Sequence, residues 1–360
     1  MILTSKIASQ MMLVIYNLLL MPHIWHSWQT STHIMKRLSA QDYVNGILES
    51  NRFVLSRAIT LVESNRDSDS ELAQTVLETL AQKKVKNSIR IGITGSPGVG
   101  KSTFIETFGL HLVGLGKKVA VLAIDPSSQR TGGSIMGDKT RMEQLVKQPN
   151  AYVRPSASGN TLGGVAKKTR EAILLCEYAN YDVIIVETVG VGQSEVAVKE
   201  MTDFFLLLML AGAGDELQGI KKGIMEMTDA IAITKADGEN IRKAKKAGGE
   251  YTGALHLFPS NKSGWYPKVL TCSAIEQTGI AEIWELIESF KIKMTENHFF
   301  SQNRSNQNLH WLHETIRQKL LHNFYSDQIV KKALKANETA VKSGEKSAYK
   351  VALELLKLAK

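Results

Sequence analysis

The stretch GITGSPGVGKSTF, from Gly92 to Phe104, decides the fold that this sequence predicts. Within it, GSPGVGKS satisfies the phosphate-binding pattern G-x-x-x-x-G-K-[ST]. An apolar run typical of a buried strand precedes the pattern, and a helical pattern follows it. The glycines allow successive backbone N–H groups to wrap around phosphate oxygens, and the helix N-terminus adds the positive end of its dipole. The sequence therefore predicts a P-loop that holds the phosphates of a nucleotide.

The loop residues fall into two groups by their expected role. Lys101 reaches the β- and γ-phosphates and stabilises the charge that develops on them, and the Ser102 hydroxyl ligates Mg²⁺. The remaining positions surround the phosphates with backbone: Gly95, Ser96, Pro97, Gly98, Val99 and Gly100.

Short, nearly continuous apolar runs rich in Val, Ile and Leu recur along the middle of the chain. Parallel strands look like this, because helices cover both faces of their sheet. Helical patterns such as residues 163–180 separate the runs, so we expect an α/β P-loop NTPase fold with a doubly wound, mostly parallel sheet and helices on both faces. The expected strands are residues 89–95, 118–125, 181–188, 204–210, 230–234 and 268–274.

The segments on either side of this pattern have a helical period. Residues 42–85 precede the strands, and residues 310–325 and 347–359 follow them after a polar interruption at 301–308. The tail is too small for a core of its own, so we expect it to pack on the sheet domain or on a second subunit. The expected division is an uncertain leader at 1–35, an N-terminal helical extension at 36–88, the nucleotide domain at 89–290 and a C-terminal helical arm at 291–360.

Glu187 and Gly190 end the strand VIIVETVG in an E-x-x-G pattern. A carboxylate at this place lies beside the P-loop and can hold the Mg²⁺ shell, and the Gly190 N–H can sense the γ-phosphate. Asp125 and Asp138 are further candidates for the metal shell. A helix cap and a turn residue are the alternative interpretations of these two aspartates.

The TKADG segment, residues 234–238, predicts which base is bound. Asp237 can accept hydrogen bonds from N1–H and the exocyclic amine of guanine, whereas adenine presents a bare acceptor at N1. Lys235 can lay its stem along the base. The usual guanine motif reads N-K-x-D, so Thr234 replaces an asparagine and predicts weaker tethering of the loop. The Ser273 and Ala274 backbone is expected near the guanine oxygen, and together these residues favour GTP over ATP.

No glutamine follows Gly190 directly, because Val191 occupies that position and the nearest candidate for orienting water is Gln193. The sequence therefore predicts slow intrinsic hydrolysis.

Composition excludes several other classes. The chain has 360 residues, 43% hydrophobic and 22% charged, with a net charge of +9. No basic run is interleaved with aromatic residues, so we expect no nucleic-acid partner. Cys176 and Cys272 are too few for a disulfide framework, and their apolar surroundings indicate buried thiols in a reducing compartment.

The apolar run at 11–21 is too short to span a bilayer, and no cleavage signature of a secretory signal follows it. A weak transit-peptide character and a misplaced start codon, with Met35 as the true start, are the two interpretations; the second is favoured. We expect no membrane span.

Seven segments in order resemble the MeaB/ArgK family, the methylmalonyl-CoA mutase-associated GTPases of the SIMIBI class. They are GSPGVGKST, DPSS, GGSIMGDKTRM, RPSASGNTLGGVAKKTREAI, VETVGVGQSE, GAGDELQGIKKGIMEMTD and TKADG. The resemblance runs from about Asp42 to the C-terminus. It implies a GTP-hydrolysing chaperone that gates cofactor loading and protects or rescues an adenosylcobalamin-dependent acyl-CoA mutase.

The resemblance also implies roles for single residues. It adds Thr103 to the phosphate site, and it assigns Asp125, Asp138 and Glu187 to the Mg²⁺ shell. Lys221, in the last of three implied switch regions, would link the nucleotide state to the mutase surface, although an ordinary solvated lysine is an equal alternative. The family's C-terminal arm implies a homodimer. A cytoplasmic protein is expected, or a mitochondrial-matrix one from a eukaryotic source.

Three other functions are open. One is an ATP-binding kinase or ATPase linked to transport of lysine, arginine or ornithine, which Asp237 disfavours. Another is a GTPase that delivers nickel, for which a His-rich or Cys-x-x-Cys segment is lacking. The third is a scaffold with a decayed nucleotide site, which is disfavoured because no expected phosphate ligand is missing.

Overall fold

A computed structural model describes residues 37–84, 87–124, 142–154, 162–188, 194–212, 222–258 and 263–358. The predictions for the leader at 1–35 lie outside these ranges. No helix within them has the length and apolar character that crossing a membrane requires.

A seven-stranded sheet forms the centre of the fold, and every pair of neighbouring strands is parallel. The strand order is β3-β2-β4-β1-β5-β6-β7, so β1 lies in the middle and the chain winds outward to both edges. The strands are β1 (Ile89–Gly95), β2 (Val119–Ile124), β3 (Ala151–Arg154), β4 (Val183–Thr188), β5 (Phe204–Leu210), β6 (Ala230–Thr234) and β7 (Lys268–Thr271).

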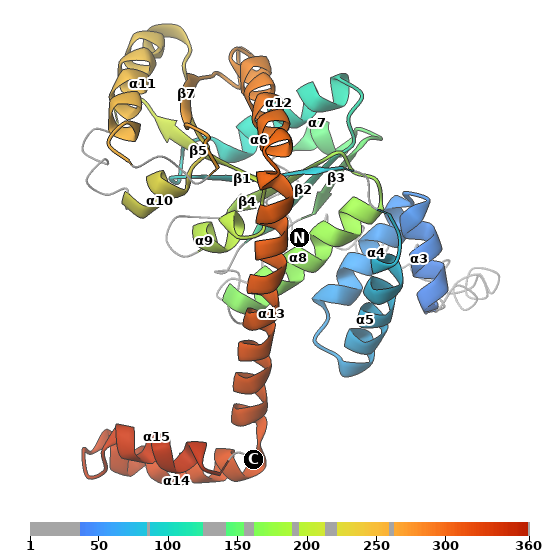
Figure 1. Cartoon of the computed structure of the whole chain (residues 1–360), viewed down its shortest axis with the longest axis vertical. Helices are drawn as coiled ribbons and strands as arrows, with labels where there is room; N and C mark the ends of the chain where they lie inside the picture. Colours follow the sequence, from blue (N-terminus) through green and yellow to red (C-terminus); the bar gives the residue numbers. More distant parts are fainter. Residues whose placement is uncertain are drawn as a thin grey trace, which may run out of the picture.

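Helices cover both faces of this sheet, as the continuous apolar runs predict (Figure 1). One face packs against α6 (Lys101–Gly114), α7 (Glu143–Val146) and α12 (Ile280–Glu296). The other packs against α8 (Leu162–Tyr178) and α9 (Ser194–Lys199), and farther along against α10 (Lys222–Met227) and α11 (Ile241–Leu255). The predicted doubly wound α/β fold is confirmed, with a seventh strand, β3, that the sequence did not predict.

Three helices precede the sheet and pack on α8 rather than standing apart. They are α3 (Ala40–Leu48), α4 (Arg52–Glu63) and α5 (Asp67–Ala81). A capping box starts α3, because Ser39 accepts from the Asp42 N–H and the Asp42 carboxylate accepts from the Ser39 N–H. The N-terminal helices therefore share one apolar core with the second face of the sheet.

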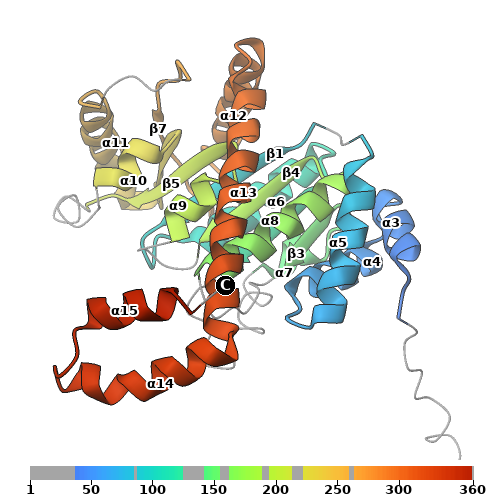
Figure 2. The ribbon, with the colours of Figure 1, turned by 60° about the horizontal axis from the view of Figure 1, so that its bottom comes forward.

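The C-terminal arm begins directly after α12. Its first helix, α13 (Phe299–Ser326), runs for 28 residues away from the sheet, and α14 (Gln328–Lys342) and α15 (Ala348–Leu356) lie at its far end (Figures 1 and 2). The expected interruption at 301–308 is wrong, because those residues are the first turns of α13. Their polar side chains include the contacts that hold the helix to the domain.

Both cysteines are buried and free, as predicted. Burial raises the pKa of the Cys176 thiol, with Glu177 adding to the effect, and it raises the pKa of Cys272 to about 12. Neither thiol is a reactive nucleophile at neutral pH.

Candidate functional site

The P-loop joins β1 to α6 in a backbone path that two glycines make possible. Gly100 has φ +91 at the start of α6, a left-handed conformation that other residues adopt only with strain. A β-carbon at Gly95 would lie 2.6 Å from the carbonyl oxygen of Leu208 on β5. The loop therefore follows the sheet edge closely and turns directly into the helix.

Lys101, the first residue of α6, folds back over this loop. Its Nζ donates to the Gly95 carbonyl oxygen at 2.6 Å and to the Ser96 carbonyl oxygen at 3.3 Å. Burial lowers the pKa of the Lys101 ammonium, and the nearby Glu187 and Glu195 oppose that effect. A cation held over a loop of backbone donors is suited to a phosphate chain.

Two oxygen donors meet beside the loop. Ser102 Oγ lies 3.5 Å from Oε1 of Glu187, which is buried on β4 in register with Ile93 of β1. Hydroxyl and carboxylate oxygens suit Mg²⁺, which usually takes one or two protein ligands and fills the rest with phosphates and water. Within the described residues, no group of three or more His, Cys, Asp or Glu side chains surrounds a point that a metal could occupy. The pair therefore fits Mg²⁺ bound together with a nucleotide.

Thr234 ends β6 directly behind the P-loop. Its hydroxyl lies 2.8 Å from the carbonyl oxygen of Val99, in the loop, and 3.2 Å from the carbonyl oxygen of Met209 on β5. The Thr234 side chain is buried, so this bond is shielded from water. Threonine therefore tethers the loop, and the expectation that this tether is weaker than one made by asparagine stays a prediction.

Asp237 and the loop after β7 meet at the same edge of the sheet. Ser273 Oγ donates to Asp237 Oδ2 at 2.6 Å, which fixes the orientation of the carboxylate. The Ala274 carbonyl oxygen accepts from Thr107 on α6 at 3.1 Å, so the loop is also held to the P-loop helix. Lys235 lies close by, with its Cε 3.9 Å from where a β-carbon of Gly100 would stand.

These residues enclose a cavity of about 140 Å³. Seven of its lining residues are ones that the sequence predicted to contact the nucleotide: Val99, Gly100, Thr103, Thr234, Lys235, Asp237 and Ala274. Three others were not predicted from the sequence: Phe104, Cys272 and the 80% exposed Ile275. Adjacency to the P-loop and to Ser273 was the available signal for all three.

Five predicted site residues lie outside the described residues: Asp125, Asp138, Gly190, Gln193 and Lys221. The roles expected for them in metal binding, γ-phosphate sensing, water positioning and partner contact stay predictions.

The P-loop lies at the carboxyl edge of a parallel sheet, and Asp237 faces it across a base-sized recess. This arrangement is that of a P-loop GTPase, and the chain belongs to that class. Within the class it is a member of the family described as "Methylmalonyl Co-A mutase-associated GTPase MeaB", which residues 55–328 match. Among its relatives, a "Probable GTPase" of Mycobacterium tuberculosis is 47% identical over 322 residues, which are 88% of this chain and 96% of the relative.

Two further relatives bear on function. The mouse protein "Methylmalonic aciduria type A homolog, mitochondrial" is 43% identical over 321 residues, covering 87% of this chain and 77% of its own length. A solved structure described as "Crystal structure of LAO/AO transport system kinase" is 37% identical with a TM-score of 0.70, covering 89% of this chain and 97% of that one.

Proposed function

We propose that this GTPase requires Mg²⁺ and serves as a chaperone for an adenosylcobalamin-dependent acyl-CoA mutase of the methylmalonyl-CoA type. In this proposal it gates loading of the cobalamin cofactor and protects or reactivates the mutase. GTP orders the loops around the nucleotide, the ordered state changes the grip on the mutase, and hydrolysis resets it.

Each residue at the site has a separate task in this proposal. Backbone N–H groups between Gly95 and Thr103, other than at Pro97, which has none, hold the phosphate chain, and Lys101 balances the charge that develops as water attacks the γ-phosphate in line. Ser102 and Glu187 would hold Mg²⁺, which supplies charge neutralisation when bound, and Asp125 and Asp138 would complete its shell. Gln193 is the proposed positioning residue for water, and the Gly190 N–H the proposed sensor of the γ-phosphate.

The Ser273–Asp237 hydrogen bond supports the guanine assignment most directly. Because Ser273 donates to one carboxylate oxygen, the carboxylate of Asp237 is held in one orientation and keeps acceptor capacity for the two N–H donors of guanine. Adenine offers an acceptor at N1 and would leave the carboxylate desolvated without a donor.

Membership of a mutase-associated family and the mouse relative support the choice of partner. The test is size-exclusion chromatography of the purified full chain with adenosylcobalamin-dependent methylmalonyl-CoA mutase, in GDP and in a non-hydrolysable GTP analogue. We expect a complex whose stability differs between the two nucleotides, and the Lys101→Ala variant to lose that difference. If no complex forms in either nucleotide, the partner assignment is wrong while the GTPase assignment stands.

A transport-linked ATPase or kinase is a second candidate, favoured by the description of the 37% identical structure as a transport system kinase. Competition of ATP and GTP against a fluorescent guanine nucleotide separates the two. We expect GTP to displace the probe and ATP at the same concentration to leave it bound; displacement by both would favour the second candidate.

We also propose that the arm forms a homodimer. Four exposed apolar side chains follow one face of α13 at helical spacing, namely Leu309, Leu312, Ile316 and Leu320. The described part of the chain leaves this stripe uncovered, and an exposed stripe of this length is typical of an interface. The buried, free cysteines suit a reducing compartment, so we place the protein in the cytoplasm, or in the mitochondrial matrix of a eukaryote.

A further inference from the structure

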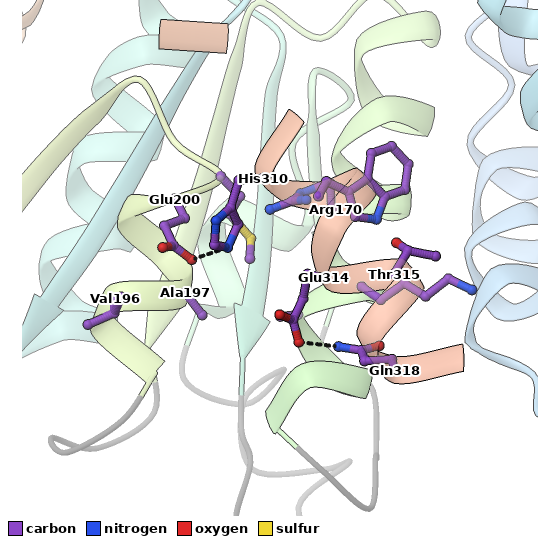
Figure 3. Close-up of a pocket in the computed structure, with 12 residues that line it drawn as sticks. Arg170, Val196, Ala197, Glu200, His310, Glu314, Thr315 and Gln318 are labelled. Carbon is purple, nitrogen blue, oxygen red and sulfur yellow. Dashed lines mark hydrogen bonds and ion pairs between the residues drawn. The ribbon is translucent and has the colours of Figure 1, made fainter. Parts of the chain in front are cut away.

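A second cavity, of about 330 Å³, lies between α8, α9 and α13 (Figure 3). It shares no lining residue with the cavity beside Asp237. Its volume falls in the range of about 300–1,000 Å³ that is usual for small-molecule sites. Apolar atoms line much of it, from Ala166, Val196, Ala197, Met201 and Trp311.

Most charged side chains at this cavity already pair with another side chain: a lysine, a histidine and an arginine each lie within 4 Å of a glutamate. Both glutamates that line the cavity, Glu200 and Glu314, have such a partner within 4 Å, and from beyond contact distance their charges partly offset the lowering of the Arg170 pKa by burial. The pairs are Lys167 with Glu171 at 3.7 Å, His310 with Glu200 at 3.1 Å and Arg317 with Glu314 at 3.3 Å.

Arg170 is different. Within the described ranges its guanidinium makes no ion pair and donates no hydrogen bond, and its one close partner is the ring of Trp311, 5.3 Å from Cζ to the ring centroid. Burial lowers the pKa of Arg170, whereas at Arg304 burial is outweighed by the hydrogen bonds and charge of Asp203, which raise the pKa. Among the described residues, none accepts a hydrogen bond from the five N–H donors of the half-buried Arg170.

The indole of Trp311 adds a second unmatched donor on the same wall. Its Nε1 is buried and has no acceptor among the described residues. Buried donors of this kind usually have an acceptor in folded proteins, because leaving one without a partner destabilises the fold. Arg170 and Trp311 therefore present donors from which no described residue accepts, although Glu314 of α13 and Glu200 line the same cavity.

We propose that this cavity binds a small organic carboxylate, with its two oxygens on the fork of Arg170 and its apolar body against Trp311 and α9. A planar guanidinium matches a carboxylate with two parallel hydrogen bonds. The apolar walls select an acid that carries a hydrocarbon or aromatic body over a small inorganic anion.

The test is titration of the full-length ¹⁵N-labelled protein with sodium benzoate, followed at the indole N–H resonance of Trp311, which the Trp311→Phe variant assigns. Benzamide, neutral and of the same shape, is the ligand control. We expect benzoate to shift the resonance saturably and benzamide to bind at least tenfold more weakly. The absence of a saturable shift, or equal binding of the two compounds, would overturn the proposal.

Variants test the residue itself. We expect Arg170→Gln to weaken benzoate binding at least tenfold, and Arg170→Lys, which keeps the charge and loses the fork, to weaken it severalfold. Arg57→Gln is the matched control, because Arg57 also covers an aromatic ring, that of Phe53 at 5.8 Å, and it does not line the cavity. Equal affinity in the wild type and a folded Arg170→Gln variant, judged by thermal unfolding, contradicts the site.

Discussion

Thr234 occupies the position at which guanine-binding loops usually carry asparagine. An asparagine has two polar arms, and threonine has one hydroxyl, which can donate only one proton at a time. In this chain that hydroxyl lies nearer the Val99 carbonyl oxygen than the Met209 one, at 2.8 Å against 3.2 Å. The hydroxyl of Thr234 is therefore used to hold the P-loop, through the Val99 carbonyl oxygen.

Thr234→Val should lower the affinity for both GTP and GDP about tenfold, because the loop loses a buried hydrogen bond of roughly 1–1.5 kcal/mol while the side-chain shape is kept. Titration with a fluorescent GDP measures the change. Thr252→Val is the control, since the Thr252 hydroxyl donates at 2.8 Å to the Gly248 carbonyl oxygen within the exposed face of α11. Equal losses in both variants would show that Thr234 acts through general stability.

Asp237→Asn should change the preferred base from guanine to xanthine. Guanine loses a charged acceptor worth about 1.5–3 kcal/mol, so GTP affinity should fall roughly 10- to 150-fold. Xanthine carries a carbonyl where guanine carries the exocyclic amine, and the amide of the variant can donate to it. Competition between GTP and XTP measures the exchange; an unchanged preference for GTP would place the base elsewhere.

The polar part of this site could be predicted from the sequence, and the apolar part could not. Asp237 follows the buried strand β6 and Ser273 follows the neighbouring strand β7, and the carboxyl ends of parallel strands meet at one edge. Phe104, Cys272 and Ile275 carry no chemical signature that separates a pocket wall from core or surface. Their place depends on the path of the loops, which a sequence pattern does not contain.

At the scale of elements, α13 shows how a polar segment can attach a helix firmly to the sheet domain. Arg304 donates to both carboxylate oxygens of Asp203, at 2.8 and 2.7 Å, and lies 3.4 Å from Glu177. Gln307 donates to the Thr202 carbonyl oxygen at 2.7 Å. Apolar periodicity cannot reveal such a contact, so the sequence predicted a break where the helix is in fact anchored.

Arg304→Met should destabilise the fold by about 3–5 kcal/mol, because the buried Asp203 loses the cation that binds both of its oxygens, whereas Glu177 keeps its pair with Arg90. Arg317→Met, on the same helix, should change stability by about 0–1 kcal/mol, since its pair with Glu314 is exposed to solvent. Urea unfolding followed by circular dichroism compares the two. Similar, small effects of both substitutions would contradict the anchor.

Strand prediction succeeded where burial is complete. The bounds predicted for β1, β5 and β6 match those of the structure, because these strands are almost fully buried and read as unbroken apolar runs. The edge strand β3, Ala151–Arg154, was missed. It has four residues, and its Arg154 pairs with Glu63 of α4, so its sequence lacks the apolar run of a central strand.

At the scale of the whole molecule, the proposed homodimer depends on the apolar stripe of α13. Changing Leu312 and Leu320 together to glutamate should convert a dimer into a monomer, since both side chains are more than half exposed in the single chain and charge is costly to bury at an interface. Light scattering coupled to size-exclusion chromatography measures the mass. Lys319→Glu, an exposed substitution on the same helix, should leave the dimer intact.

A glutamate pair that left the mass unchanged, or a wild-type chain that was already monomeric, would contradict the dimer. Neither result would affect the nucleotide site, because none of the residues that line its cavity lies on α13, α14 or α15.

Binding of a guanine nucleotide at the edge of the sheet, between the P-loop and Asp237, is the central claim. Isothermal titration calorimetry of the full chain in Mg²⁺-containing buffer, with GDP and ADP in separate runs, tests it most directly. We expect saturable one-to-one heat with GDP and none with ADP at the same concentrations. No heat with GDP from the folded protein, or equal binding of the two nucleotides, would contradict it.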